Sequence, residues 1–151
     1  MPTANPNLRE YEVRARSTDI FGRVLLSARN HQFVIDGPIQ NDCPGEALTP
    51  AESFLSGVAG CCVELMHVIA RDEKAPLQKA QVRIYGVVDR ERQASTEVTV
   101  FNSVLIEIEL AGVTPSQGES IVAGFRRRCP LYGTVATAVK DVTVKVKTLT
   151  S

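Results

Sequence analysis

The feature that most constrains the fold of this 151-residue chain is a long apolar segment that starts at Thr49 and Pro50. Thr49 can cap the first turn of a helix, Pro50 suits the first helical position, and Glu52 can complete a capping box. Apolar residues then recur with helical spacing at Leu55, Val58, Cys62, Leu65 and Ile69. The segment therefore predicts a helix that starts at residue 50 and ends at residue 71 or 72.

The predicted helix has a wide apolar arc, because Phe54, Cys61 and Val68 flank the main stripe. A helix of this kind is normally buried on most of its surface, and a single sheet would leave its back uncovered. Gly57 and Gly60 each cost about 1 kcal/mol of helix propensity, which indicates that another backbone approaches there. We therefore expect a partner helix or a second subunit to cover this helix.

A second helix is predicted near the C-terminus. Thr114-Pro115-Ser116-Gln117 repeats the start signal of the first helix, so a helix should run from there to about Arg128. Cys129-Pro130 should end or kink it, because Pro130 has no N–H and disfavours helical geometry at the residue before it. Residues 131–139 are expected to add a further helical turn or two.

The remaining segments predict strands and loops. Strand patterns occupy residues 8–16, 23–28, 32–36, 82–89, 96–101, 104–110 and 141–148, the first three as an antiparallel meander. Residues 1–7 should be frayed, and residues 37–48 should form a loop that contains Cys43. Because the strands do not alternate singly with helices and no linker is evident, we predict one α+β domain over residues 1–151.

Charge and composition exclude several classes of function. Lys plus Arg and Asp plus Glu are 17 each, which disfavours nucleic-acid binding and electrostatic membrane anchoring. No apolar run is expected to be long enough to span a bilayer, and the N-terminus lacks the form of a signal peptide. A cytoplasmic location is expected, where four cysteines are free, metal-bound or redox-active rather than structurally bridged.

The adjacent Cys61 and Cys62 allow three interpretations. Both can be small core hydrophobes, and Cys62, on the main apolar stripe, fits that role best. A zinc site lacks the usual Cys-x-x-Cys spacing, and His67 is poorly spaced from either thiol, so no metal is expected. The third interpretation is thiol redox chemistry at Cys61, on the edge of the stripe, with a second cysteine to resolve the product.

Cys129 is the candidate for that second cysteine. It lies at the predicted helix break, directly after Arg126, Arg127 and Arg128. Nearby positive charge would favour a thiolate there, although an arginine run on a helix is also an ordinary solvated face.

Three motifs together resemble the OsmC/Ohr family of thiol peroxidases over nearly the whole chain. Residues 29–38 are similar to the family's Arg-x-His…Asp-x-Pro strand, and residues 49–61 to its Pro-x-Glu…Cys helix. Cys129-Pro130 resembles the family's second Cys-Pro. The resemblance implies an OsmC-like fold, in which antiparallel sheets wrap around two central helices in an intertwined homodimer with active sites at the dimer interface.

The resemblance also implies a function and roles for particular residues. Cys61 would attack an organic hydroperoxide and become a sulfenic acid, and Cys129 would condense with it to a disulfide that a small-molecule or protein thiol reduces. An arginine would activate Cys61 and be steered by Glu52. Arg23 is the nearest candidate for that arginine, and Arg16 is the next. No cofactor is implied.

An alternative function keeps the family fold without the chemistry. In this alternative the protein is a non-catalytic OsmC-like protein that binds a small apolar ligand at the dimer interface, and its cysteines are merely buried.

Overall fold

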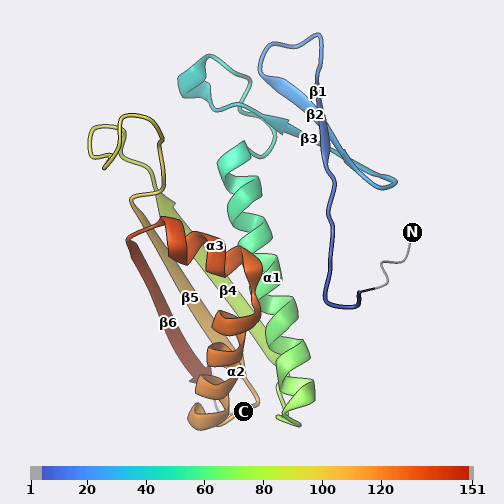
Figure 1. Ribbon diagram of the computed structural model, residues 1–151, viewed down its shortest axis with the longest axis vertical. Coiled ribbons are helices and arrows are strands. Elements are labelled where there is room, and N and C mark those ends of the chain that lie inside the picture. Colours follow the sequence, from blue (N-terminus) through green and yellow to red (C-terminus); the bar gives the residue numbers. More distant parts are fainter. Residues whose placement is uncertain (1–4, 150–151) are drawn as a thin grey trace. The chain divides into compact units, whose positions relative to one another are not determined.

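The computed structural model describes residues 5–149, which form two compact units (Figure 1). The first unit ends at Ser53 and the second begins at Phe54. The expectation of a single domain stays a prediction.

The N-terminal unit contains the predicted antiparallel meander. Its strands are β1 (Arg14–Ser17), β2 (Arg23–Ala28) and β3 (His31–Asp36), hydrogen-bonded in that order, and a short 3-10 helix, η1 (Ile39–Asn41), follows. Strand β1 begins later than the predicted residue 8. Arg14 lies opposite Ser27, so the chain before it soon reaches the end of β2 and has no partner strand. Residues 1–4 of the stretch predicted to be frayed lie outside the described residues.

The remaining elements build the C-terminal unit. Helix α1 (Pro50–Asp72) starts in the N-terminal unit and continues into this one. It is followed by β4 (Lys79–Val87), β5 (Ser103–Ala111), α2 (Pro115–Arg128), α3 (Pro130–Ala138) and β6 (Asp141–Leu149). Both predicted helices and the helical segment after Pro130 are confirmed, and the fold is α+β.

The second sheet is mixed and not purely antiparallel as expected. Its strand order is β4-β5-β6, with β4 antiparallel and β6 parallel to β5. Strands β5 and β6 are parallel because α2 and α3 connect them. These helices carry the chain back to the end of the sheet where β5 begins, so β6 runs in the same direction as β5. Figure 1 shows the three helices on one face of this sheet.

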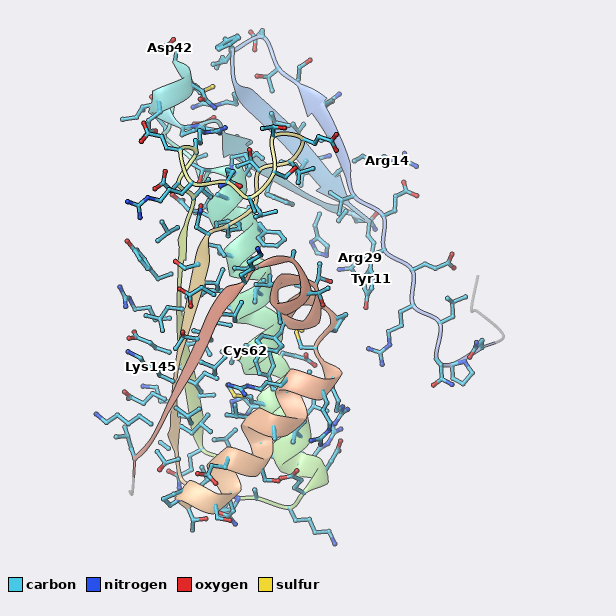
Figure 2. The ribbon with its side chains drawn as sticks, turned by 60° about the vertical axis from the view of Figure 1, so that its left-hand side comes forward. Tyr11, Arg14, Arg29, Asp42, Cys62 and Lys145 are labelled. Atoms are coloured by element: carbon cyan, nitrogen blue, oxygen red, sulfur yellow. The ribbon has the colours of Figure 1, made fainter. Side chains whose placement is uncertain are left out.

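Alternation along β5 divides the sheet into an apolar and a polar face. The side chains of Val104, Ile106, Ile108 and Leu110 are at most 2% exposed. On the opposite face Glu107 lies between Arg83 and Lys145, and its carboxylate accepts a hydrogen bond from Arg83 at 2.9 Å. Figure 2 shows Lys145 on the side of the sheet away from the helices. The apolar face therefore forms the core, and the other face is polar.

Helix α1 supplies the centre of that core. Val58, Cys62, Met66 and Ile69 are buried with residues of β5 and α2. By length and composition alone α1 is also apolar enough to cross a membrane, so the expectation that no run reaches that length was wrong. A single helix of this kind is weak evidence for a membrane span, because the core helix of a soluble protein passes the same test.

The strand predicted at residues 96–101 is a loop. The side chain of Gln93 occupies the backbone groups that a partner strand would pair. Its Oε1 accepts from the Val100 N–H at 2.8 Å, and its Nε2 donates to the Val100 carbonyl at 3.1 Å. Asn102 adds a second brace, since its Nδ2 donates to the Arg92 carbonyl at 2.7 Å. Side chains thus satisfy the backbone of this loop, and local β propensity did not decide its structure.

The close packing of α2 generates a test with a matched control. A Cβ on Gly118 would lie 2.6 Å from Thr148 Cγ2, whereas a Cβ on Gly133 would meet no atom within 4 Å. Both glycines are the fourth residue of their helix. We expect Gly118→Ala to destabilise the protein by about 1–3 kcal/mol through overpacking. Gly133→Ala should stabilise it by about 0.5–1 kcal/mol through helix propensity. Urea unfolding measures both, and equal effects would contradict the packing described.

Candidate active site

The C-terminal unit brings two of the predicted site residues together. Cys61 lies on α1 and is partly exposed, and Cys129 lies between α2 and α3 and is 2% exposed. Their Sγ atoms are 3.0 Å apart, within hydrogen-bond contact, and both are free thiols. Two elements far apart in the sequence therefore hold a dithiol.

A break between two helices positions Cys129. Its backbone is extended, with φ −83° and ψ 112°, so it ends α2 and starts α3. Its N–H donates to the Phe125 carbonyl at 2.9 Å, which closes α2. Its sulfur accepts the Tyr132 N–H at 3.3 Å, the position of a side-chain N-cap. Pro130 enforces the break, since it disfavours helical geometry at Cys129 and suits the first position of α3.

The surroundings of Cys61 keep its thiol protonated. Burial, followed by the hydrogen bond to Cys129 and the charges of Cys129 and Glu64, raises the pKa of Cys61 to about 12. Burial also raises the pKa of Cys62 to about 12. Cys62 is fully buried in the core, the place predicted from its position on the stripe (Figure 2). At neutral pH both helix cysteines are therefore neutral thiols, and attack by Cys61 requires a group that takes its proton or stabilises its charge.

Arg23, the predicted activating residue, lies in the N-terminal unit and is already ion-paired there. Its Nε and one terminal nitrogen donate to the two carboxylate oxygens of Asp36 at 2.8 and 2.9 Å, and that nitrogen also donates to Glu46 at 3.0 Å. The guanidinium holds the pKa of Asp36 well below its usual range. An activating role for Arg23 stays a prediction. Arg16, the next candidate, lies exposed on β1.

Asp36 joins this pair to the loop that follows β3. Its side chain has no solvent exposure, and its carboxylate accepts the N–H groups of Glu46 and Ala47 at 3.0 and 2.9 Å. The carboxylate therefore ties β2 to the far end of the loop. Sequence analysis included Asp36 only as part of a motif and missed Glu46, because the pairing depends on the β2–β3 register and on the loop's return path.

Glu52 takes the structural role predicted for it. Its N–H donates to Thr49 Oγ1 at 3.3 Å, and its carboxylate accepts the Thr49 N–H at 3.4 Å. These two bonds form the expected capping box at the start of α1. The steering of an arginine by Glu52 stays a prediction.

Cys43 fills a space left by two glycines of the N-terminal unit. A Cβ on Gly22 or Gly37 would lie 2.3 or 2.4 Å from its sulfur. Its partly buried side chain therefore packs against backbone in the loop.

An apolar cavity of about 240 Å³ lies in the C-terminal unit. The rings of Phe54 and Phe101 are stacked there with centroids 5.9 Å apart. Gly86 makes room for the Phe101 ring, since a Cβ there would lie 2.9 Å from two ring carbons. The other lining residues come from the loop before Phe101 and from α3 and its end: Thr99, Val100, Thr134, Val135, Ala138 and Val139. Sequence analysis missed this cavity because it placed Phe101 in a strand.

Metal-ligating residues do not gather in the described part of the chain. Within residues 5–149, no group of three or more His, Cys, Asp or Glu side chains is placed to hold a metal ion.

Comparison with known proteins identifies the family. The family described as OsmC-like protein matches residues 43–145, a segment that contains both cysteines of the dithiol. The chain belongs to the OsmC-like family. A comparison with curated protein sequences gave no match.

Solved structures of OsmC-like proteins share the fold. An organic hydroperoxide resistance protein from Elizabethkingia anophelis is 14% identical with a TM-score of 0.78, and the match covers 96% of this chain and 100% of that one. An organic hydroperoxide resistance protein OsmC from Legionella pneumophila is 20% identical, with a TM-score of 0.73 and coverages of 93% and 98%. The OsmC-like protein from Mycoplasma pneumoniae is 14% identical, with a TM-score of 0.76 and coverages of 94% and 97%. At these identities the likeness establishes the fold.

The buried Asp36 carboxylate generates a pH-dependent test. Its pKa is lower in the folded than in the unfolded protein, so its stabilising contribution is present above the unfolded value of about 4 and is lost as pH falls below it. We expect Asp36→Asn to lower the free energy of unfolding at about pH 7 and to flatten its decline between about pH 5 and about pH 2. Asp42→Asn is the matched control, because Asp42 is exposed with a φ of 57° that asparagine tolerates. Urea titrations at several pH values measure this, and an unchanged acid slope in Asp36→Asn would contradict it.

Proposed function

We propose that this OsmC-like protein is a thiol-dependent peroxidase that reduces organic hydroperoxides to alcohols. The contact of Cys61 Sγ with Cys129 Sγ at 3.0 Å is the observation that carries the proposal. Support also comes from the family and from the printed names of the Elizabethkingia and Legionella proteins, both organic hydroperoxide resistance proteins.

The dithiol can complete a full reduction cycle. Cys61 sulfur attacks the distal peroxide oxygen, the O–O bond breaks, and the alkoxide leaves as an alcohol after it takes a proton. Cys61 is then a sulfenic acid, which Cys129 sulfur attacks to form a disulfide and release water. The two thiols are oxidised as the peroxide is reduced, and a small-molecule or protein thiol restores them.

The apolar cavity is the proposed site for the organic part of the peroxide. Phe54 precedes Cys61 by seven residues on α1, which places them about 10 Å apart along one helix face. Helix α3 starts directly after Cys129 and supplies Thr134, Val135 and Ala138 to the same cavity. Both helices that hold a thiol thus continue to the cavity, which favours an organic hydroperoxide over hydrogen peroxide.

Other features of the proposal concern assembly and activation. We propose a homodimer, because Gly60 of α1 is exposed and a Cβ there would meet no atom within 4 Å. A second copy of α1 would cover such a face. We also propose that Arg23, steered by Glu52, activates Cys61. The proposed location of the protein is the cytoplasm.

A second candidate function is binding without chemistry. Its support is that burial, the contact with Cys129 and the nearby Glu64 all disfavour a thiolate at Cys61, while an apolar cavity is present. In this case the chain would bind a small apolar ligand and leave peroxide unreduced.

The proposed reaction is tested with one equivalent of cumene hydroperoxide and mass-spectrometric mapping of disulfides. We expect the parent protein to form a Cys61–Cys129 disulfide within seconds, and Cys61→Ser to lose at least about 100-fold in peroxide consumption because the nucleophile is absent. Cys62→Ala removes the neighbouring buried thiol and should keep the activity. Free thiols in the parent after minutes, or equal rates in Cys61→Ser, would favour the binding function.

The role of the cavity is tested with Phe101→Ala. Loss of part of an aromatic wall should cost roughly 1.5 kcal/mol, which lowers kcat/KM for cumene hydroperoxide about tenfold. The value for hydrogen peroxide should not change, because hydrogen peroxide has no apolar group to bind. Tyr85→Ala is the control, since Tyr85 is an exposed aromatic residue on the polar face of the β4-β5-β6 sheet and does not line the cavity. Equal losses for both peroxides would place the substrate elsewhere.

A further inference from the structure

We propose that Gly86 sets the width of the apolar cavity and thereby selects hydroperoxides that carry an aromatic ring. The inference rests on the proposed peroxidase function for the identity of the ligand. It adds a positioning residue, because Gly86 does not itself line the cavity and acts through the ring of Phe101, which does.

Gly86 interrupts an apolar row on the core face of β4. Val82 and Ile84 precede it on the same face, and its pairing partner on β5 is the buried Val104. A glycine inside a strand weakens the strand and often marks a place where another group comes close to the backbone. Here that group is the ring of Phe101, which occupies the space that a side chain at position 86 would fill.

The Phe101 ring lies against the β4 backbone because Gly86 has no Cβ. A Cβ there would lie 2.9 Å from the Cδ1 and Cε1 atoms of the ring, and 3.2 Å from Leu55 Cδ1 on α1. Carbon atoms in favourable contact are about 3.5–4.0 Å apart, so a methyl group would displace the ring by about 0.5 Å or more. Because the ring lines the cavity and Gly86 does not, this displacement moves the ring into the cavity.

The backbone on both sides of Phe101 is fixed by hydrogen bonds, so the ring does not withdraw through a shift of the loop. Before it, Gln93 holds both the N–H and the carbonyl of Val100, at 2.8 and 3.1 Å. After it, the Asn102 N–H donates to the Val87 carbonyl on β4 at 2.8 Å. A methyl group behind the ring is therefore accommodated by rotation of the Phe101 side chain, which narrows the cavity.

The lining of the cavity favours a neutral ligand with a flat ring. The residues that line it within the described part of the chain carry no charge, and two of them are the stacked Phe54 and Phe101. Aromatic rings attract a further ring in offset-stacked or edge-to-face geometry, which adds to the binding that buried apolar area provides. An uncharged aryl hydroperoxide therefore fits a cavity of about 240 Å³ better than a peroxide with a compact aliphatic group.

Two peroxides that differ by one group measure the selection, since cumene hydroperoxide carries a phenyl group where tert-butyl hydroperoxide carries a methyl group. We expect Gly86→Ala to lower kcat/KM for cumene hydroperoxide about tenfold, and to leave the value for tert-butyl hydroperoxide within about twofold of the parent. Gly133→Ala is the control, because a Cβ at this position of α3 meets no atom within 4 Å, and neither value should change. Equal losses for both peroxides in Gly86→Ala would overturn the inference, because general damage to the fold affects both alike.

A double variant tests whether Gly86 acts through Phe101. Leucine is smaller than phenylalanine, so Phe101→Leu leaves room for the methyl group that Gly86→Ala adds. We expect Gly86→Ala to change kcat/KM for cumene hydroperoxide less than about twofold when Phe101→Leu is already present, because the two positions are coupled by direct contact. A tenfold loss in that background as well would overturn the proposed role of Gly86.

Binding of the product alcohols distinguishes this inference from the function on which it rests. NMR titrations with cumyl alcohol and tert-butanol need no turnover. We expect Gly86→Ala to weaken the binding of cumyl alcohol about tenfold, with tert-butanol and the Gly133→Ala control unchanged. This binding pattern in a protein that leaves peroxides unreacted would support the role of Gly86 and overturn the peroxidase function. A reactive parent whose preference for cumene hydroperoxide and affinity for cumyl alcohol both survive Gly86→Ala would overturn the role of Gly86 alone.

Discussion

The packing of α1 against the β4-β5-β6 sheet determines where Cys61 and Cys62 lie. Val58, Cys62 and Met66 are fully buried on this face, so the rotation of the helix is fixed. Adjacent residues on a helix point about 100° apart, and burial of Cys62 therefore turns Cys61 toward the edge of the core. The same hydrophobic contact that stabilises the fold thus separates a core thiol from the thiol that we propose to react, although the two are neighbours in sequence.

The break at Cys129-Pro130 supplies the second half of the site. A continuous helix would use the Tyr132 N–H in its own ladder, whereas the break frees it to donate to Cys129 Sγ. The tilted packing of the Phe125 and Tyr132 rings, with centroids 5.2 Å apart, joins the last turn of α2 to the first turn of α3. The break at Pro130 therefore places Cys129 Sγ both at the start of α3 and in contact with Cys61 Sγ.

Local signals predicted the helices and the two central cysteines, because capping boxes, apolar periodicity and Cys-Pro act over short distances. Features that depend on long-range pairing were missed. The side chain of Gln93 hydrogen-bonds the backbone N–H and carbonyl of Val100, seven residues away. The segment predicted as a strand is therefore a loop, and it lines the cavity. Arg23 was chosen as the activating residue from its position in a turn, but its partner Asp36 lies 13 residues away and is reached only through the β2–β3 register.

The two units also place their strongest charges differently. In the N-terminal unit, Arg23 is neutralised by Asp36 and Glu46, so activation of a thiol would compete with two carboxylates. In the C-terminal unit, the groups acting on Cys61 are negative or apolar. A thiol in such a setting becomes a nucleophile when its proton leaves as its sulfur attacks, because no free thiolate then has to form beforehand. The side chain in contact with Cys61 within this unit is another thiol, because Cys129 Sγ lies 3.0 Å from Cys61 Sγ.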